Sequence, residues 1–238
     1  MQTLFPIENS FKKMCDASPL NKYFYEKYIL FKHILLEDFY DLIREAKPGF
    51  TDHSHTHIKN VLNKINSLCS HKVNYEQYEN SEYIKLFELY LLLMSVIFHD
   101  VAMIIEDRER HADLSKIINL FDSVILTDDE KEWIQKIVKC HQSKSKIEQI
   151  ITIDNKMLMD FGIYPQFLAS MLRLADELDE SKSRANLIGI KTGKIPKKQL
   201  IYHDISKAFD GIRPVSSSQS IDIEISTQKH ALFKKYKK

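Results

Sequence analysis

The feature that most constrains the fold is an almost unbroken apolar run from Leu89 to Phe98, which ends at His99-Asp100. A stretch this apolar belongs in a core, so other elements must surround it. Burying a histidine and a carboxylate at its end costs free energy unless both are satisfied. A divalent metal ion would satisfy them, and a buried hydrogen bond between the two side chains is the ordinary structural alternative.

Composition favours a mainly helical, cytoplasmic protein. The 238 residues include only five glycines and six prolines, fewer than sheet-rich folds usually need. The formal net charge of +1 gives no global argument for binding nucleic acid or membranes. Cys15, Cys69 and Cys140 lack CxxC spacing, which predicts a reducing compartment and no disulfide framework. We expect no signal peptide, and the apolar run reads as too short to span a bilayer.

Two histidines follow the first helical region. Apolar side chains recur every three or four residues over about the first 46 residues, and Pro48-Gly49 then ends that helix. A second helix, capped by Thr51 or Asp52, is expected to carry His53 and His57 on one face. A single histidine such as His57 can also be a surface or satisfied core residue.

Further histidines follow the third helix, which is predicted from Ser81 to Phe98. His111 is expected at the start of an amphipathic helix. Thr127-Asp-Asp-Glu130 is a capping-box pattern that opens another helix, with His141 at the end of its inward face. His141 therefore either borders a cleft or is an ordinary surface residue.

One carboxylate falls inside an apolar series. The helix predicted from Pro165 places Asp176 among inward positions, where a carboxylate needs a cation, a metal or hydrogen-bond donors. The neighbouring Glu177, Asp179 and Glu180 are expected to be solvated.

The sequence pattern changes after residue 185. Alternating polar and apolar residues predict a β-strand over Ile221–Ser226, with a loop over Gly211–Ser220 before it. We therefore expect a helical domain over residues 1–185 and a small α+β extension with a basic tail over residues 186–238.

The ordered motifs of the helical part resemble a known superfamily. His57-Ile-Lys-Asn-Val61, Val96-Ile-Phe-His-Asp100 and Leu172-Arg-Leu-Ala-Asp176 are similar to the motifs of the HD-domain metal-dependent phosphohydrolases. The resemblance covers roughly residues 50–185 and implies an HD-type helical bundle.

A closer likeness is to bacterial HD domains that precede a GHKL-type ATPase module. The residues that carry it are Phe50-Thr-Asp-His53, Arg110-His111 with Ser115, and Asp176-Glu-Leu-Asp179 followed by Ser183-Arg184. Because no ATPase follows, we expect either a trimmed or minimal member or an ATPase partner that is supplied separately.

The resemblance also implies a set of metal ligands. It assigns one divalent ion to two histidines and two aspartates, and a second ion to two further histidines, with one aspartate bridging. The ions could be Mn, Fe, Mg, Ni, Co or Zn. The residues at those positions are His57, His99, Asp100 and Asp176 for the first ion, and the bridging Asp100 with His111 and His141 for the second.

Other residues are candidates for catalysis or substrate binding. Asp100 is expected to be catalytic, and His53 could protonate a leaving group or only contact the ligands. Arg110, Lys144 and Arg184 are candidate phosphate contacts, although each could be an ordinary surface charge.

These features predict a phosphohydrolase that acts on a nucleotide or a related phosphate ester. Met103 occupies the position where many two-metal HD phosphodiesterases have a lysine, which counts against the cyclic-dinucleotide branch. The alternative is a catalytically weak metal-binding module that senses a nucleotide or docks a partner ATPase in a signalling or defence system. Nucleic-acid binding is disfavoured because the chain has no aromatic and basic stripe.

Overall fold

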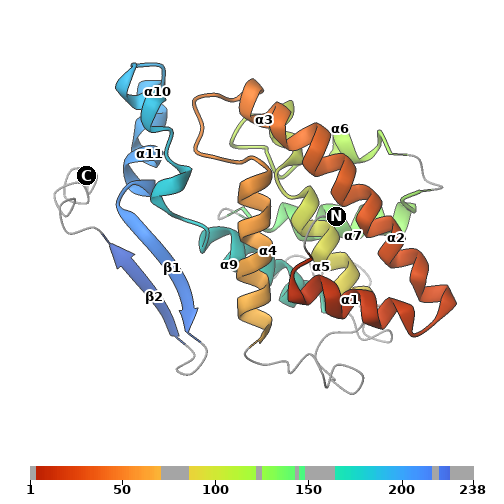
Figure 1. Cartoon of the computed structure of the whole chain (residues 1–238). Coiled ribbons are helices and arrows are strands. Elements are labelled where there is room, and N and C mark those ends of the chain that lie inside the picture. Colours follow the sequence, from red (N-terminus) through yellow and green to blue (C-terminus); the bar gives the residue numbers. More distant parts are fainter. Residues whose placement is uncertain are drawn as a thin grey trace.

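The computed structural model describes residues 4–70, 86–121, 125–142, 145–147, 164–215 and 220–225. Its N-terminal layer contains α1 (Pro6–Asp16) and α2 (Pro19–Ile34), and each of these helices has proline in its first turn. A π-helical turn (Leu35–Phe39) joins α2 to α3 (Tyr40–Ala46), so that the three segments form one long element (Figure 1).

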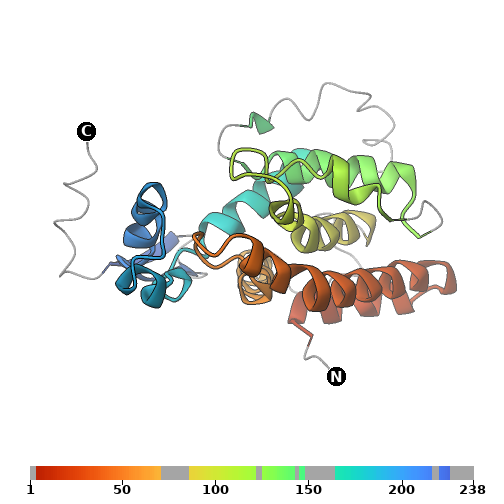
Figure 2. The same ribbon diagram turned by 90° about the horizontal axis from the view of Figure 1, so that it is seen from above.

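The apolar run forms the centre of the bundle. It is α5 (Leu86–Phe98), in which every side chain from Glu88 onward is buried. α4 (His55–Ser70), α7 (Asp128–Lys139) and α9 (Pro165–Glu177) pack around it. Figure 2 shows the N-terminal helices as one layer on the side of α5 opposite α7. The prediction of a mainly helical bundle is confirmed.

The apolar segment is longer than the sequence indicated. Leu86–Ile104 spans 19 residues and is by length and composition sufficient to cross a membrane, but 89% of its most apolar window is buried inside the fold. The prediction that the run is too short was therefore wrong, because the 3-10 turn Val101–Ile104 extends it. Its burial is that of a core helix in a globular protein.

Two histidines lie outside the helices predicted for them. α4 begins after Ser54, whose Oγ accepts a hydrogen bond from Thr56 N at 3.2 Å, so neither Thr51 nor Asp52 caps it. His53 therefore lies in the preceding loop and not on the helix face. His111 lies in a turn before the short helix α6 (Ser115–Ile118).

The capping box of α7 is confirmed. Thr127 Oγ1 accepts from Glu130 N at 3.3 Å, and Glu130 Oε2 accepts from Thr127 N at 2.8 Å. The same carboxylate accepts two hydrogen bonds from Lys27 Nζ, at 2.7 and 2.8 Å, and both side chains are buried. This ion pair links α2 to α7 inside the bundle.

The C-terminal extension contains α10 (Leu187–Lys191), α11 (Leu200–Ser206) and an antiparallel pair of strands, β1 (Phe209–Val215) and β2 (Ser220–Ile225). The strand predicted over Ile221–Ser226 is confirmed over its described residues. The loop predicted over Gly211–Ser220 is wrong for its first half, which is part of β1. Gly211 and Pro214 lower the strand propensity of that segment, but pairing with β2 overrides it.

The buried side chain of His203 links this extension to the loop before α4. His203 Nδ1 accepts from Asn186 N at 3.1 Å, and its Nε2 donates to Gly49 O at 3.0 Å. A side chain at Gly49 would place Cβ 2.7 Å from Pro196, so only glycine permits this close approach. The extension therefore packs directly against the segment that carries His53.

Candidate metal centre

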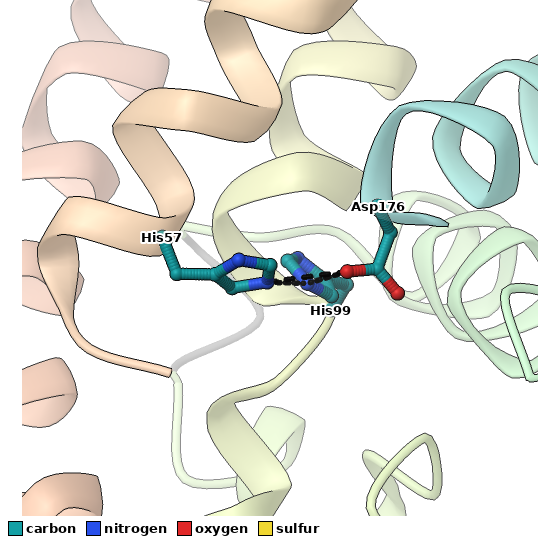
Figure 3. Close-up of side chains that lie close together, drawn as sticks. All are labelled: His57, His99 and Asp176. Atoms are coloured by element: carbon teal, nitrogen blue, oxygen red, sulfur yellow. Dashed lines mark hydrogen bonds and ion pairs between the residues drawn. The ribbon is translucent and has the colours of Figure 1, made fainter. Parts of the chain in front are cut away.

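Three helices bring together the first group of candidate ligands. His57 projects from α4, His99 follows α5, and Asp176 lies on α9, and all three side chains point toward one another (Figure 3). His57 Nε2 lies 3.2 Å from His99 Nε2 and 3.2 Å from Asp176 Oδ1. Both histidines are fully buried.

Asp100 connects this first group to a second one. Its Oδ2 lies 3.4 Å from His57 Nε2 and 3.2 Å from His99 Nε2. Its Oδ1 lies 3.8 Å from the Nε2 atoms of both His111 and His141, which are themselves 2.9 Å apart. Each carboxylate oxygen thus faces a different histidine pair, which is the arrangement of a bridging ligand.

All four histidines present the same ring nitrogen to the centre. In each ring Nδ1 lies between 2.6 and 2.8 Å from an oxygen: Asp179 Oδ2 for His57, and the carbonyls of Val96, Arg108 and Val138 for His99, His111 and His141. A carbonyl oxygen or an ionised carboxylate only accepts, so in the neutral rings Nδ1 carries the hydrogen. In His111 the Arg108 carbonyl at 2.6 Å is closer to Nδ1 than the amide nitrogen of Gln142 at 3.0 Å, and the same assignment holds. Four Nε2 lone pairs therefore converge, and lone pairs at 2.9 and 3.2 Å repel unless a cation or a proton compensates them.

Electrostatics keep the two carboxylates ionised. Burial alone would raise the pKa of Asp100, but the charge of His99 and hydrogen bonds from His57 and His99 outweigh it and hold that pKa well below its usual value. Burial would likewise raise the pKa of Asp176, but the hydrogen bond from His57 outweighs it and lowers that pKa. Ionised carboxylates are the form that binds metal.

The histidines of the two groups differ in their affinity for protons. Burial and then Arg184 lower the pKa of His57, but hydrogen bonds to Asp100, Asp176 and Asp179 outweigh both and raise it well above its usual value. Burial lowers the pKa of His141 to about 4, so this ring is a neutral donor at ordinary pH. A cation at the first group therefore competes with protons, because the same carboxylates stabilise either charge.

Sequence reasoning missed Asp179. It was expected to be solvated, yet it is buried at 4% exposure and its Oδ2 accepts from His57 Nδ1 at 2.7 Å. The prediction was wrong because α9 ends at Glu177, and the following turn directs Asp179 back toward α4. The signal in the sequence that could have revealed Asp179 is its spacing of three residues from Asp176, which places both carboxylates on the same side of a helical turn. A carboxylate in this position fixes the ring and makes Nε2 a stronger donor.

The remaining predicted residues lie at different distances from the centre. His53 Nε2 is 4.0 Å from Asp100 Oδ2 and 3.2 Å from Arg184 Nη2, so these two residues lie beside the ligands. Arg110 is exposed and pairs with Glu106 at 2.7 Å, which already compensates its charge. Lys144 lies outside the described residues.

The protonation state of His53 decides between its two predicted roles, which are to protonate a leaving group or only to contact the ligands. Its Nδ1 donates to Thr51 O at 2.6 Å, and its Nε2 accepts from Arg184. Burial holds the pKa of His53 well below its usual value despite the opposing charge of Asp100. A neutral ring with Nε2 as acceptor is a poor proton donor, so the structure favours contact with the ligands over protonation of a leaving group.

The candidate ligands come from several helices and converge where His99-Asp100 follow the buried helix α5. This arrangement defines an HD-type domain that could hold a metal ion. The comparison with known families agrees. The HD-CE family matches residues 47–236, most of the chain, and the protein belongs to this family. No curated protein and no solved structure matches the chain.

Proposed function

We propose that this protein is a divalent-metal-dependent phosphohydrolase that acts on a nucleotide or a related phosphate ester. The observation that carries the proposal is the convergence of four histidine Nε2 atoms on Asp100, whose two oxygens face different histidine pairs. The candidate ligands form two groups of three, and Asp100, a member of the second group, also lies close to both histidines of the first. Such an arrangement suits a pair of ions better than a single closed structural site.

The donor set fits the proposed cofactor. His57, His99 and Asp176 would hold one ion, and His111 and His141 the other, with Asp100 shared between them. Imidazole nitrogens with carboxylate oxygens suit Mn, Fe, Co, Ni or Zn, and Mg is the least favoured by four imidazoles. When bound, such ions supply Lewis acidity, which activates water and neutralises charge on phosphoryl oxygens.

The chain's own residues would orient the substrate. Asp179 and three backbone carbonyls keep the hydrogens on Nδ1, so the donor atoms face inward before a substrate arrives. Arg184 Nη2 lies 3.2 Å from His53 Nε2, which is itself 4.0 Å from Asp100 Oδ2, so this guanidinium borders the candidate ligands and can pair with a phosphate oxygen. The buried α5 behind the ligands excludes bulk water from that side.

One observation favours a second candidate function. Met103 is buried where many two-metal HD phosphodiesterases have lysine, so no ammonium group can assist at that position. Together with the likeness to HD domains that precede GHKL-type ATPases, this supports a cytoplasmic regulatory module that senses a nucleotide or docks an ATPase partner. Family membership alone does not decide between the two functions.

Metal analysis and a hydrolysis panel separate these functions. The purified protein is analysed for metal content and assayed with nucleotides and a generic phosphodiester in Mn, Mg, Ni, Co or Zn, with Asp100→Ala as the control. Two ions per chain and turnover that disappears in Asp100→Ala are the expected results. Bound metal without turnover on any substrate would favour the regulatory module, and absence of metal would contradict both.

A further inference from the structure

Arg108 is tied to the metal centre but was not recognised in the sequence. Its carbonyl oxygen accepts from His111 Nδ1 at 2.6 Å, so its backbone helps to orient one candidate ligand. Its guanidinium lies over the ring of Tyr202, 3.7 Å from the ring centroid, and 5.8 Å from the centroid of Phe50. Tyr202 belongs to α11, so the C-terminal extension holds this side chain in place.

The guanidinium of Arg108 has no ionic partner among the described residues. Its Nη1 is buried and makes no hydrogen bond within that part of the chain. Glu180 lies near enough to influence the charge, yet its Oε1 is itself buried without a hydrogen bond and forms no ion pair with Arg108 in the described structure. Burial lowers the pKa of Arg108, and the charge of Arg184 lowers it further. Tyr202, Asp100 and Glu180 raise it, but they do not outweigh the lowering effects.

Arg184 is a second guanidinium whose charge is not neutralised by an ion pair with the described residues. Its Nε donates to Asp52 O at 3.1 Å and its Nη2 donates to His53 Nε2 at 3.2 Å. Both acceptors are neutral groups. Phe50 lies near both arginines: its ring centroid is 5.8 Å from Arg108 Cζ and 6.4 Å from the ring centroid of His53, which accepts the hydrogen bond from Arg184.

Arg108 and Arg184 each carry a positive charge that no ion pair with the described residues neutralises, and Arg108 also has a buried Nη1 that makes no hydrogen bond with them. We propose that Arg108 and Arg184 bind a second phosphate group of the substrate, beside the phosphate that reacts at the metal centre. This inference rests on the proposed phosphohydrolase function and narrows its substrate to esters with at least two phosphate groups. Guanidinium is suited to this ligand because its planar donors match two phosphate oxygens at once.

A neighbouring cavity has room for the rest of such a substrate. Its volume is about 650 Å³, and His53 and Arg184 line it together with Phe50 and the apolar side chains Ile43 and Leu187. This volume and mixed lining are typical of sites for small organic molecules. Arg184 therefore lies where an organic group in the cavity and a phosphate at the metals would meet, and Arg108 lies behind the cavity wall at Phe50.

Pyrophosphate binding tests the proposal without requiring turnover. Calorimetry measures the affinity of the metal-loaded protein for inorganic pyrophosphate and for inorganic phosphate, in the wild type and in Arg108→Gln. Arg213→Gln is the matched control, because it removes the same charge from an exposed arginine that pairs with Glu224. We expect Arg108→Gln to weaken pyrophosphate binding roughly tenfold or more, phosphate binding much less, and the control neither.

The possible outcomes separate this proposal from the proposed function. If Arg108→Gln binds pyrophosphate as tightly as Arg213→Gln does, the second phosphate site is wrong, even if the protein hydrolyses phosphate esters. If pyrophosphate binding depends on Arg108 but no ester is hydrolysed, the anion site stands and the enzymatic function fails.

A second pair of variants keeps the test decisive if Arg108→Gln does not fold. Tyr202→Ala removes the ring that holds the guanidinium, whereas Tyr202→Phe retains it. Weaker pyrophosphate binding in Tyr202→Ala alone supports the proposal. Equal pyrophosphate affinity in these two variants overturns it.

Discussion

The hydrogen bond between Asp179 and His57 provides a sharp test of the metal centre. Asp179 contributes no atom to the two groups of candidate ligands, but its Oδ2 lies 2.7 Å from His57 Nδ1 in a fully buried setting. Asp179→Asn retains an oxygen that can accept the hydrogen bond and removes the negative charge. Asp179→Ala removes both, and leaves the Nδ1 hydrogen without its acceptor.

The expected loss of metal affinity follows from the role of a carboxylate that orients a ligating histidine. Loss of a group that orients a ligating histidine typically lowers metal affinity about 10- to 100-fold, which corresponds to roughly 1.4 to 2.8 kcal/mol. We expect Asp179→Asn near the lower limit, because the ring stays oriented and only its donor strength falls. Asp179→Ala should approach the upper limit, and it should also lower stability by about 1 to 3 kcal/mol through the buried unsatisfied donor.

Competition against a chromogenic chelator measures this metal affinity. Asp210→Asn is the matched control, because Asp210 is a more exposed carboxylate that pairs with Lys182 at 3.1 Å. Thermal unfolding of each variant shows whether it is folded before titration. If Asp179→Ala binds metal as tightly as Asp210→Asn while remaining folded, His57 is not a ligand that Asp179 orients, and the assignment of the first group is wrong.

Three further predictions concern the second ion, pH and the core. His141→Ala should bind one ion per chain where the wild type binds two, as measured by elemental analysis; unchanged stoichiometry would contradict the second group. The raised pKa of His57 stabilises the folded chain below pH 6.5, and this stability is lost as the pH rises through the folded pKa. Protein freed of metal by a chelator should therefore melt at lower temperature as the pH rises across that window, whereas saturating Mn²⁺ should remove the trend. Lys27→Met should cost about 3 to 5 kcal/mol in urea unfolding, because it leaves Glu130 as a buried unpaired charge; a cost under about 1 kcal/mol would show that the capping hydrogen bonds suffice.

The sequence was sufficient for those parts of the site that lie on strongly patterned helices. The apolar run of α5 had to be buried, and its end therefore had to place His99 and Asp100 in the interior. Asp176 interrupts an inward apolar series, which is how a carboxylate with a buried partner is recognised. Periodicity determines these positions because each depends only on the helix that carries it.

Residues that depend on loops and on packing between distant segments were not accessible in the same way. His53 was assigned to a helix face, although Ser54 delays the start of α4 by an alternative local hydrogen bond. Asp179 was expected to be solvated, and Arg108 was not singled out. Each is covered by a segment more than 90 residues away in the chain, Asp179 by α4 and Arg108 by α11. A charged residue in a polar stretch carries no local mark of such burial.

The extension is best understood as part of the site. α11 supplies Tyr202 to the guanidinium of Arg108 and His203 to the carbonyl of Gly49, and Lys64 of α4 donates to Ile212 O in β1. The family match from residue 47 to 236 likewise does not stop at the end of the helical bundle. An appendage with its own function would not need contacts directed at the same loop that carries His53. Through these contacts the extension holds Arg108 and the loop of His53 beside the candidate metal ligands.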